Sequence, residues 1–229
     1  MTSNLAPRPF NEEQRIKAVV RTGLIDAPKP EIFQVYCDLA KEISGFKSAT
    51  FSLYDGNIQC ELSNTGKENF QEGLHYDRDK YNICSYVLLD TEPLLMTDIW
   101  DEPSWKHHPR VLDRTADRGY AGFPVVNKDN YALGTLCMTD PKPKTLNTQT
   151  VKLIKKVTDN IAHLLDSQIE QKEVTSQKFL EALAIFQAKN NKLNIEDLKL
   201  FLMLCADLKT EKTDAKNLIE GDLCEVIRG

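Results

Sequence analysis

Two short apolar runs that flank a polar turn constrain the fold of this chain more than any other feature. Residues 119–126 and 132–139 carry aromatic and β-branched side chains, and the polar residues 127–131 separate them. This arrangement predicts a β-hairpin. A second hairpin is predicted upstream, where residues 49–54 and 58–62 flank the turn Asp55-Gly-Asn57. Residues 93–98 indicate one further strand.

Apolar residues recur at three- and four-residue intervals in other segments, which is the period of an amphipathic helix. They predict a first helix ended by Gly23, a second over residues 31–44, and a third from Asn147 or Thr148 through Leu165. The apolar spacing thins beyond Leu165 and returns at residues 179–186. One long helix and two helices with a hinge therefore both remain open.

Three shorter helices are predicted over residues 81–89, 195–208 and 214–226. Residues 63–80 are polar and charged and contain two glycines, which is typical of an exposed loop. Boundaries are least defined in the aromatic, proline-containing stretch 100–118.

Composition excludes several classes of protein. No apolar run approaches the roughly 20 residues that span a bilayer, and the first residues lack the pattern of a secretory signal. We therefore expect a cytoplasmic protein. The formal charge of −5 provides no bulk attraction to nucleic acid. The six cysteines lie at wide intervals without any Cys-x-x-Cys pair, which argues against a zinc ribbon or a disulfide framework and favours buried thiols.

Several short motifs occur in an order that resembles the GAF domain of bacterial signalling proteins over residues 12 to about 168. They are Thr22-Gly-Leu-Ile-Asp26, Phe51-Ser-Leu-Tyr-Asp55, Cys84-Ser-Tyr86, Met96-Thr-Asp98, Tyr120-Ala-Gly-Phe-Pro-Val125 and Leu133-Gly-Thr-Leu-Cys-Met-Thr-Asp140. The resemblance implies an α+β fold: a central antiparallel sheet with helices on one face, a loop-capped pocket on the other, and C-terminal helices beyond it. It implies a sensory domain over residues 1–168 and a helical extension over 169–229.

Gly134 lies near the start of the last predicted strand, where a glycine allows a bulge or a close backbone approach. A plain turn requirement after Tyr131 is the alternative.

The resemblance also implies which residues line or cap the pocket. These are Tyr81, Cys84, Tyr86, Asp98, Trp100, Trp105, His107, His108, Arg110, Tyr120, Thr135 and Cys137. Aromatic walls with a few polar groups suit a small planar or heterocyclic ligand of unknown identity, although the two tryptophans could simply fill space beneath a loop. His107 and His108 are neighbours that would point to opposite sides of an extended strand, so we predict no metal site.

The resemblance leaves a redox reading open, because some GAF proteins reduce free methionine sulfoxide through cysteines in this cavity. Cys84 and Cys137 are the candidates here, but the closely grouped cysteines of that enzyme pattern are missing, and buried structural thiols are the alternative. The chain contains no Cys-His dipeptide, which argues against covalent bilin attachment. The Asn-Lys…Asp-Glu signature of cyclic-nucleotide-binding GAF domains is not recognisable either. No phosphate loop, nucleophile elbow or metalloprotease motif is present. The sequence thus favours a non-enzymatic sensor or regulatory protein.

Partners are predicted from the C-terminal third. The helix from Thr150 could form a homodimer by burying Ile154, Val157, Ile161 and Leu164, or it could pack those residues on its own sheet. The later helices could dock a protein partner, since their mixed charge presents no face for nucleic acid. A GAF-like interaction scaffold without a ligand is the remaining alternative.

Overall fold

The structure is a computed structural model that describes residues 7–25, 31–66, 74–78, 82–189, 194–205 and 216–220. The chain divides into two compact units, Met1–Gln168 and Ile169–Gly229, and each is described by itself.

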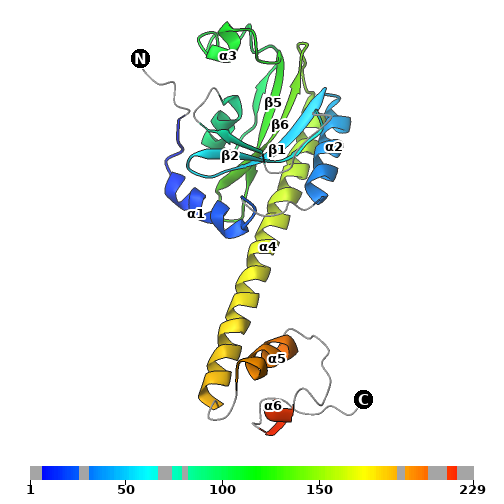
Figure 1. Ribbon diagram of the computed structural model, residues 1–229. Coiled ribbons are helices and arrows are strands. Elements are labelled where there is room, and N and C mark those ends of the chain that lie inside the picture. The colour runs from blue at the N-terminus through cyan, green and yellow to red at the C-terminus, as the bar shows by residue number, and fades with distance from the viewer. Residues whose placement is uncertain are drawn as a thin grey trace. The chain divides into compact units, whose positions relative to one another are not determined.

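Within the described residues, the first unit is built on one six-stranded antiparallel sheet (Figure 1). Its strands are β1 (Ser48–Tyr54), β2 (Ile58–Asn64), β3 (Leu74–Asp77), β4 (Leu94–Met96), β5 (Gly119–Val126) and β6 (Ala132–Asp140). Their spatial order is β3-β2-β1-β6-β5-β4. Both predicted hairpins, β1–β2 and β5–β6, are confirmed, and the sheet joins them through pairing of β1 with β6.

Strand β3 differs from the sequence prediction, which placed an exposed loop over residues 63–80. Residues 74–77 instead pair with β2 at the sheet edge. The sequence signal is weak because His75, Tyr76 and Asp77 are all exposed, so the strand lacks the alternation of buried and exposed side chains that marks a strand. Residues 67–73 and 79–81 lie outside the described part of the chain.

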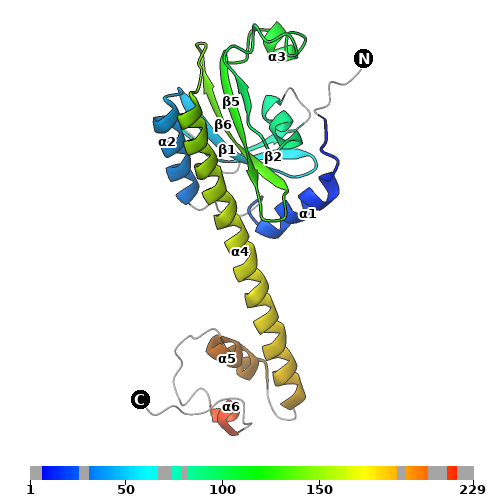
Figure 2. The same ribbon diagram turned by 180° about the vertical axis from the view of Figure 1, so that it is seen from behind.

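Three helices contribute to the core on one side of the sheet. They are α1 (Glu12–Thr22), α2 (Ile32–Ser44) and the first part of α4 (Thr148–Lys189). Figure 2 shows α2 and α4 side by side against the strands. The strands contribute alternate residues to this core, such as Ala49, Phe51 and Leu53 of β1.

The apolar residues of α4 were predicted either to form a homodimer or to pack on the chain's own sheet. Ile154, Val157, Ile161 and Leu165 are buried in the core of the chain's own first unit, with Leu164 packed partly against it. The alternative of packing on the sheet therefore holds for these residues.

The opposite side of the sheet carries a smaller core. It contains the 3₁₀ helix η1 (Ile83–Leu89), β4, and the short helix α3 (Pro109–Leu112). Val87 of η1, Val111 of α3 and Ile99 bury their side chains together with Tyr120 and Cys137 from the sheet. This layer caps the pocket face, as the resemblance implied.

Gly134 lies in β6 opposite Leu53 of β1. A Cβ atom at this position would lie 2.2 Å from the backbone oxygen of Ser52. The β5–β6 register shifts next to it, between Val125 and Val126. The predicted bulge and close approach are both present, and the neighbour is the adjacent strand.

A buried ionic cluster attaches α1 to the β1–β2 turn and to the end of β3. Arg15 and Arg78 are both fully buried, and both hydrogen-bond to the Glu12 carboxylate. Arg15 also donates to the Tyr54 carbonyl at 2.7 Å, and Arg78 donates to the Asp55 carbonyl at 2.7 Å. The first helix is therefore held by polar contacts as well as by its apolar face.

The second unit is helical in its described residues. It comprises the second half of α4, which continues from the first unit without interruption to Lys189, followed by α5 (Ile195–Cys205) and α6 (Lys216–Glu220). Ala182 and Phe186 of α4, Phe201 of α5 and Leu218 of α6 form its core. The predicted helical residues 206–208, 214–215 and 221–226 lie outside the described part of the chain. None of the helices described is long and apolar enough to cross a bilayer.

Candidate functional site

A cavity of about 720 Å³ opens on the face of the sheet opposite to α1, α2 and α4. Alternation along the strands explains its walls, because the residues between the core positions point into it. On β1 these are Ser48 and Thr50, and on β6 they are Cys137 and Thr139. Ser48 and Thr139 hydrogen-bond across the two strands, with 2.9 Å between their hydroxyl oxygens. The cavity floor is therefore hydroxyl- and thiol-bearing.

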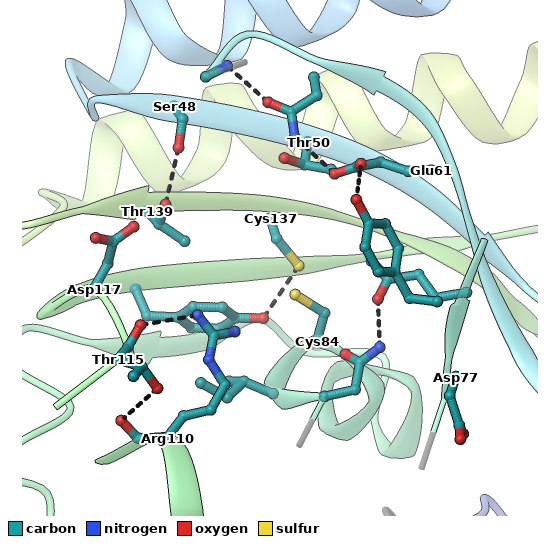
Figure 3. A pocket seen from close by; sticks show the side chains of 17 residues that line it. Ser48, Thr50, Glu61, Asp77, Cys84, Arg110, Thr115, Asp117, Cys137 and Thr139 are labelled. Atoms are coloured by element: carbon teal, nitrogen blue, oxygen red, sulfur yellow. Dashed lines mark hydrogen bonds between the residues drawn. The ribbon is translucent and has the colours of Figure 1, made fainter. Parts of the chain in front are cut away.

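One side of the cavity is a polar wall from β2 and β3. Glu61 is buried and accepts hydrogen bonds from Asn64 Nδ2 at 2.7 Å and from the Tyr76 hydroxyl at 3.2 Å. Gln59 accepts a hydrogen bond from Asn82, which precedes η1. Asp77 lines the same side, as Figure 3 shows.

The other side is formed by the segment around α3. Arg110, Thr115 and Asp117 line it, and Arg110 donates to the Thr115 carbonyl at 3.1 Å. All three residues are exposed. The opening of the cavity thus carries both a guanidinium and a carboxylate.

Two thiols meet at the centre of the cavity. Cys84 of η1 and Cys137 of β6 both line it, and Figure 3 shows their sulfur atoms facing one another. Cys137 Sγ lies 3.1 Å from the Tyr120 hydroxyl and 3.2 Å from Thr135 Oγ1. Cys137 is buried, whereas Cys84 is partly exposed.

The surroundings shift the pKa values of these two thiols in opposite directions. Burial raises the pKa of Cys137 well above the usual thiol value. The hydrogen bond from Cys137 lowers the pKa of Cys84 and, with further contributions from Tyr120, Arg110 and Tyr54, outweighs the effect of its own burial. These directions make Cys84 the thiol of the pair that loses its proton more readily.

The structure brings four of the predicted pocket residues into the cavity wall, namely Cys84, Arg110, Tyr120 and Cys137. Thr135 lies buried beside them and hydrogen-bonds to both Cys137 and the Tyr54 hydroxyl. Tyr81 lies outside the described residues.

Asp98 and Trp100 lie in the cap and are not among the residues that line the cavity. Asp98 pairs with Arg118 and accepts a hydrogen bond from the Trp100 backbone at 3.2 Å. The guanidinium groups of Arg114 and Arg118 lie over the Trp100 ring, with their Cζ atoms 4.5 Å and 5.0 Å from the ring centre. This tryptophan thus organises the cap, in line with the space-filling alternative.

Tyr86, Trp105 and His108 form an aromatic cluster within the same cap. The Tyr86 and Trp105 ring centres lie 4.8 Å apart, and those of Trp105 and His108 lie 5.4 Å apart. His108 accepts a hydrogen bond from the Arg110 backbone and so caps α3, and burial followed by the Arg110 charge lowers its pKa. His107 is exposed. The two histidines lie in a turn before α3 and not on the extended strand assumed from the sequence.

Sequence reasoning missed polar residues of both the cavity floor and the polar wall. These include Ser48, Thr50 and Thr139 of the floor and Gln59, Glu61 and Asn64 of the wall. The sequence marks them only as the polar positions that alternate with apolar ones along a strand. Which of these polar positions face the cavity follows only from the strand order. Among the described residues, no group of three potential ligands could hold a metal ion.

Comparison with known proteins relates this architecture to one family. A family model for the GAF domain matches residues 26–166. A cyclic di-GMP phosphodiesterase from Pseudomonas aeruginosa is 26% identical over 138 residues, which are 60% of this chain and 23% of that protein. The matched part of this chain therefore spans less than a quarter of that relative.

Two solved structures share the fold at 12% sequence identity. The chromophore-binding domain of the bacteriophytochrome RpBphP3 from R. palustris has a TM-score of 0.52, over 72% of this chain and 65% of that one. The blue-light absorbing form of the Thermosynechococcus elongatus PixJ GAF domain has a TM-score of 0.51, over 73% and 95%. Since the family model covers more than half of the residues and the fold agrees, this chain belongs to the GAF domain family.

Proposed function

We propose that this protein is a non-enzymatic regulatory domain that binds a small polar molecule in the cavity and transmits its presence through α4. The observation that carries the proposal is the cavity itself. Its volume of about 720 Å³ lies within the range of roughly 300–1,000 Å³ typical of small-molecule sites. The cavity is lined by converging side chains from the sheet, η1 and the α3 segment.

The charges of the lining residues favour one class of ligand. Glu61, Asp77 and Asp117 supply three carboxylates, against the single guanidinium of Arg110, among the described lining residues. Hydroxyl and amide groups complete the polar wall. A molecule with amino or other hydrogen-bond donor groups is matched by these acceptors, whereas a multiply anionic molecule such as a cyclic dinucleotide is opposed by them.

Strand β6 supplies a physical route from the cavity to α4. Cys137 and Thr139 line the cavity, while Leu136 and Met138, which alternate with them along the strand, belong to the core that also contains Ile154 and Val157 of α4. A ligand that favours one position of β6 therefore also acts on the packing of α4. Coupling of this kind requires that the ligand bind one conformation better than the other.

Native mass spectrometry of freshly purified full-length chain tests binding and subunit count together. We expect a retained small molecule, or a specific mass increase on adding amine-bearing metabolites. Thr50→Phe fills the cavity and should abolish the increase, whereas Thr148→Phe, at the exposed start of α4, should not. No bound species with any compound, or equal binding by both variants, would contradict the proposal.

Hydrogen exchange with and without the bound molecule tests transmission. We expect changed protection in peptides from residues 148–168 and from the second unit. Unchanged exchange of α4 at saturation would leave a binding domain without this output.

A homodimer and a protein partner belong to the same proposal. The later part of α4 exposes Val174, Phe179, Leu180 and Ile185, and these apolar side chains are a surface available for either. Twice the chain mass in the native spectrum, lost on Leu180→Glu, would support the dimer. A monomer at micromolar concentration would contradict it.

The adjacent thiols favour one alternative function, a thiol-dependent reductase that acts on free methionine sulfoxide. Turnover in a thiol-coupled assay should then disappear in both Cys84→Ser and Cys137→Ser. Absence of turnover in the unmodified protein would eliminate this alternative and leave the sensor proposal intact.

A further inference from the structure

Two cysteines that are far apart in the sequence share one cavity wall. Cys84 lies on the helix that covers the cavity, and Cys137 lies on the central strand that forms its floor. Their sulfur atoms face each other without forming a disulfide (Figure 3). Cys84 also packs against the buried cluster that contains Cys137, so a disulfide bond of roughly 2.05 Å requires η1 and β6 to approach each other at a place where they are already in contact.

The hydrogen-bond donors around the pair distinguish one thiol from the other. Cys137, the Tyr120 hydroxyl and the Tyr54 hydroxyl surround Cys84, and the Arg110 charge acts on it from the cavity opening. These groups stabilise a thiolate on Cys84, which is also the more exposed of the two. Cys37 provides a contrast, since burial raises its pKa to about 12.

We propose that Cys84 and Cys137 form a redox-active dithiol, which a hydroperoxide converts into a disulfide that joins η1 to β6 across the ligand cavity. Cys84 is the attacking residue and Cys137 the resolving one. This proposal goes beyond ligand sensing and does not depend on it, because the cavity needs no ligand for the thiols to meet.

The reaction balances with a hydroperoxide as the oxidant. The Cys84 thiolate attacks the distal oxygen, the O–O bond breaks, and the departing alkoxide takes up a proton to leave as an alcohol. Cys84 then carries a sulfenic acid. Cys137 attacks the Cys84 sulfur, the S–O bond breaks, and the departing hydroxide takes the Cys137 proton to leave as water. The two thiols lose two electrons in total, and a dithiol reductant restores them by exchange.

The disulfide would change the cavity without altering the rest of the sheet. It would fix η1 against β6 and remove the Cys137 thiol that now donates to Cys84. Oxidation would thereby reshape the wall against which a ligand binds.

The test uses the reduced, full-length protein and hydrogen peroxide as the probe. After peroxide treatment and alkylation of remaining thiols, digestion without reductant should yield one linked pair of peptides, containing Cys84 and Cys137. The mass of the linked pair should be two hydrogen atoms lower than the sum of the two reduced peptides. Dithiothreitol should separate the pair again. Recovery of both residues as free thiols from protein that stays folded by circular dichroism would overturn the proposal. So would a disulfide formed by other cysteines.

Single variants assign the roles of the two thiols. Cys84→Ser should consume peroxide at least about tenfold more slowly and leave Cys137 reduced. Cys137→Ser should stop at a sulfenic acid on Cys84, which a 1,3-dione reagent captures. Cys37→Ala is the matched control and should form the disulfide as the unmodified protein does.

A measurement on the unmodified protein covers the case in which a variant fails to fold. Iodoacetamide should alkylate Cys84 well before Cys37 at neutral pH, and this reactivity should vanish after oxidation. Equal reactivity of Cys84 and Cys37 would count against the assigned roles.

Discussion

The cysteines of the first unit show how far surroundings alter a single residue type. Cys37 is buried among α2 and the strands, and burial raises its pKa to about 12. Cys84 is partly exposed beside three hydrogen-bond donors and has its pKa lowered. The difference in hydrogen-bond donors therefore predicts an inert thiol at Cys37 and a reactive one at Cys84.

Replacing the Tyr120 hydroxyl tests this account of Cys84. Tyr120→Phe removes a donor to the thiol pair without removing the buried ring. The pKa of Cys84 should rise, since its thiolate loses a stabilising partner. Alkylation increases as the pH rises through the pKa of the thiol, so the pH profile of Cys84 labelling should move to higher pH. Tyr86→Phe serves as the control, because Tyr86 does not line the cavity, and an unmoved profile in Tyr120→Phe would refute the account.

At the scale of elements, the packing of β1 against β6 requires a residue without a side chain at position 134. Gly134→Ala would place a Cβ atom 2.2 Å from the Ser52 backbone oxygen, and a backbone atom in a central strand cannot easily move aside. We expect a loss of about 1–3 kcal/mol in the free energy of unfolding, measured by chemical denaturation. Gly56→Ala is the control, since its Cβ atom would meet only the flexible end of Ile16 at 3.2 Å. Equal stability of the two variants would show that β6 can shift.

Attachment of α1 depends on one carboxylate that is shared by two buried guanidiniums. Glu12→Gln leaves Arg15 and Arg78 without their anionic partner, and we expect it to destabilise the fold by about 2–4 kcal/mol. Glu13→Gln on the same helix removes only the exposed pair with Lys17 and should have little effect. Thermal denaturation of both variants makes the comparison, and similar midpoints would argue against a structural role for the cluster.

The same cluster predicts a pH dependence. Burial raises the pKa of Glu12, but hydrogen bonds and charge from Arg15 and Arg78 outweigh burial and lower it overall. A lowered pKa in the folded state means that the stabilisation is present above the usual glutamate pKa and is lost as the pH falls through the folded value. The stability advantage over Glu12→Gln should therefore shrink under acid conditions. A constant difference across that range would contradict the assignment.

At the scale of the whole molecule, the two units have separate cores. Phe201 packs on Phe186 with 5.8 Å between ring centres, in a core that shares no residue with that of the sheet. Phe201→Ala should cost about 3–5 kcal/mol within the second unit. Hydrogen exchange should then rise in α5 while peptides of β5 and β6 stay protected. Ile195→Ala, at a largely exposed position of α5, is the control, and loss of protection in both units would indicate one cooperative fold.

Local patterns in the chain were sufficient for most elements and for part of the site. Hairpins β1–β2 and β5–β6 followed from apolar runs around short turns, and the helices from their periodicity. Cys84, Tyr120 and Cys137 were identified as site residues through family-like motifs. Such features can be read directly because alternation and helical periodicity are properties of neighbouring residues.

Other features arose only once distant segments had packed together. Strand β3 forms because β2 offers it an edge, and Arg78 is buried because α1 supplies Glu12. Glu61 becomes part of a cavity wall because β2 lies beside β1, which in turn pairs with β6. The two thiols meet because η1 folds over β6. Long-range pairing leaves no local periodic trace, so the chemistry of this cavity depends on contacts between residues that the linear order keeps apart.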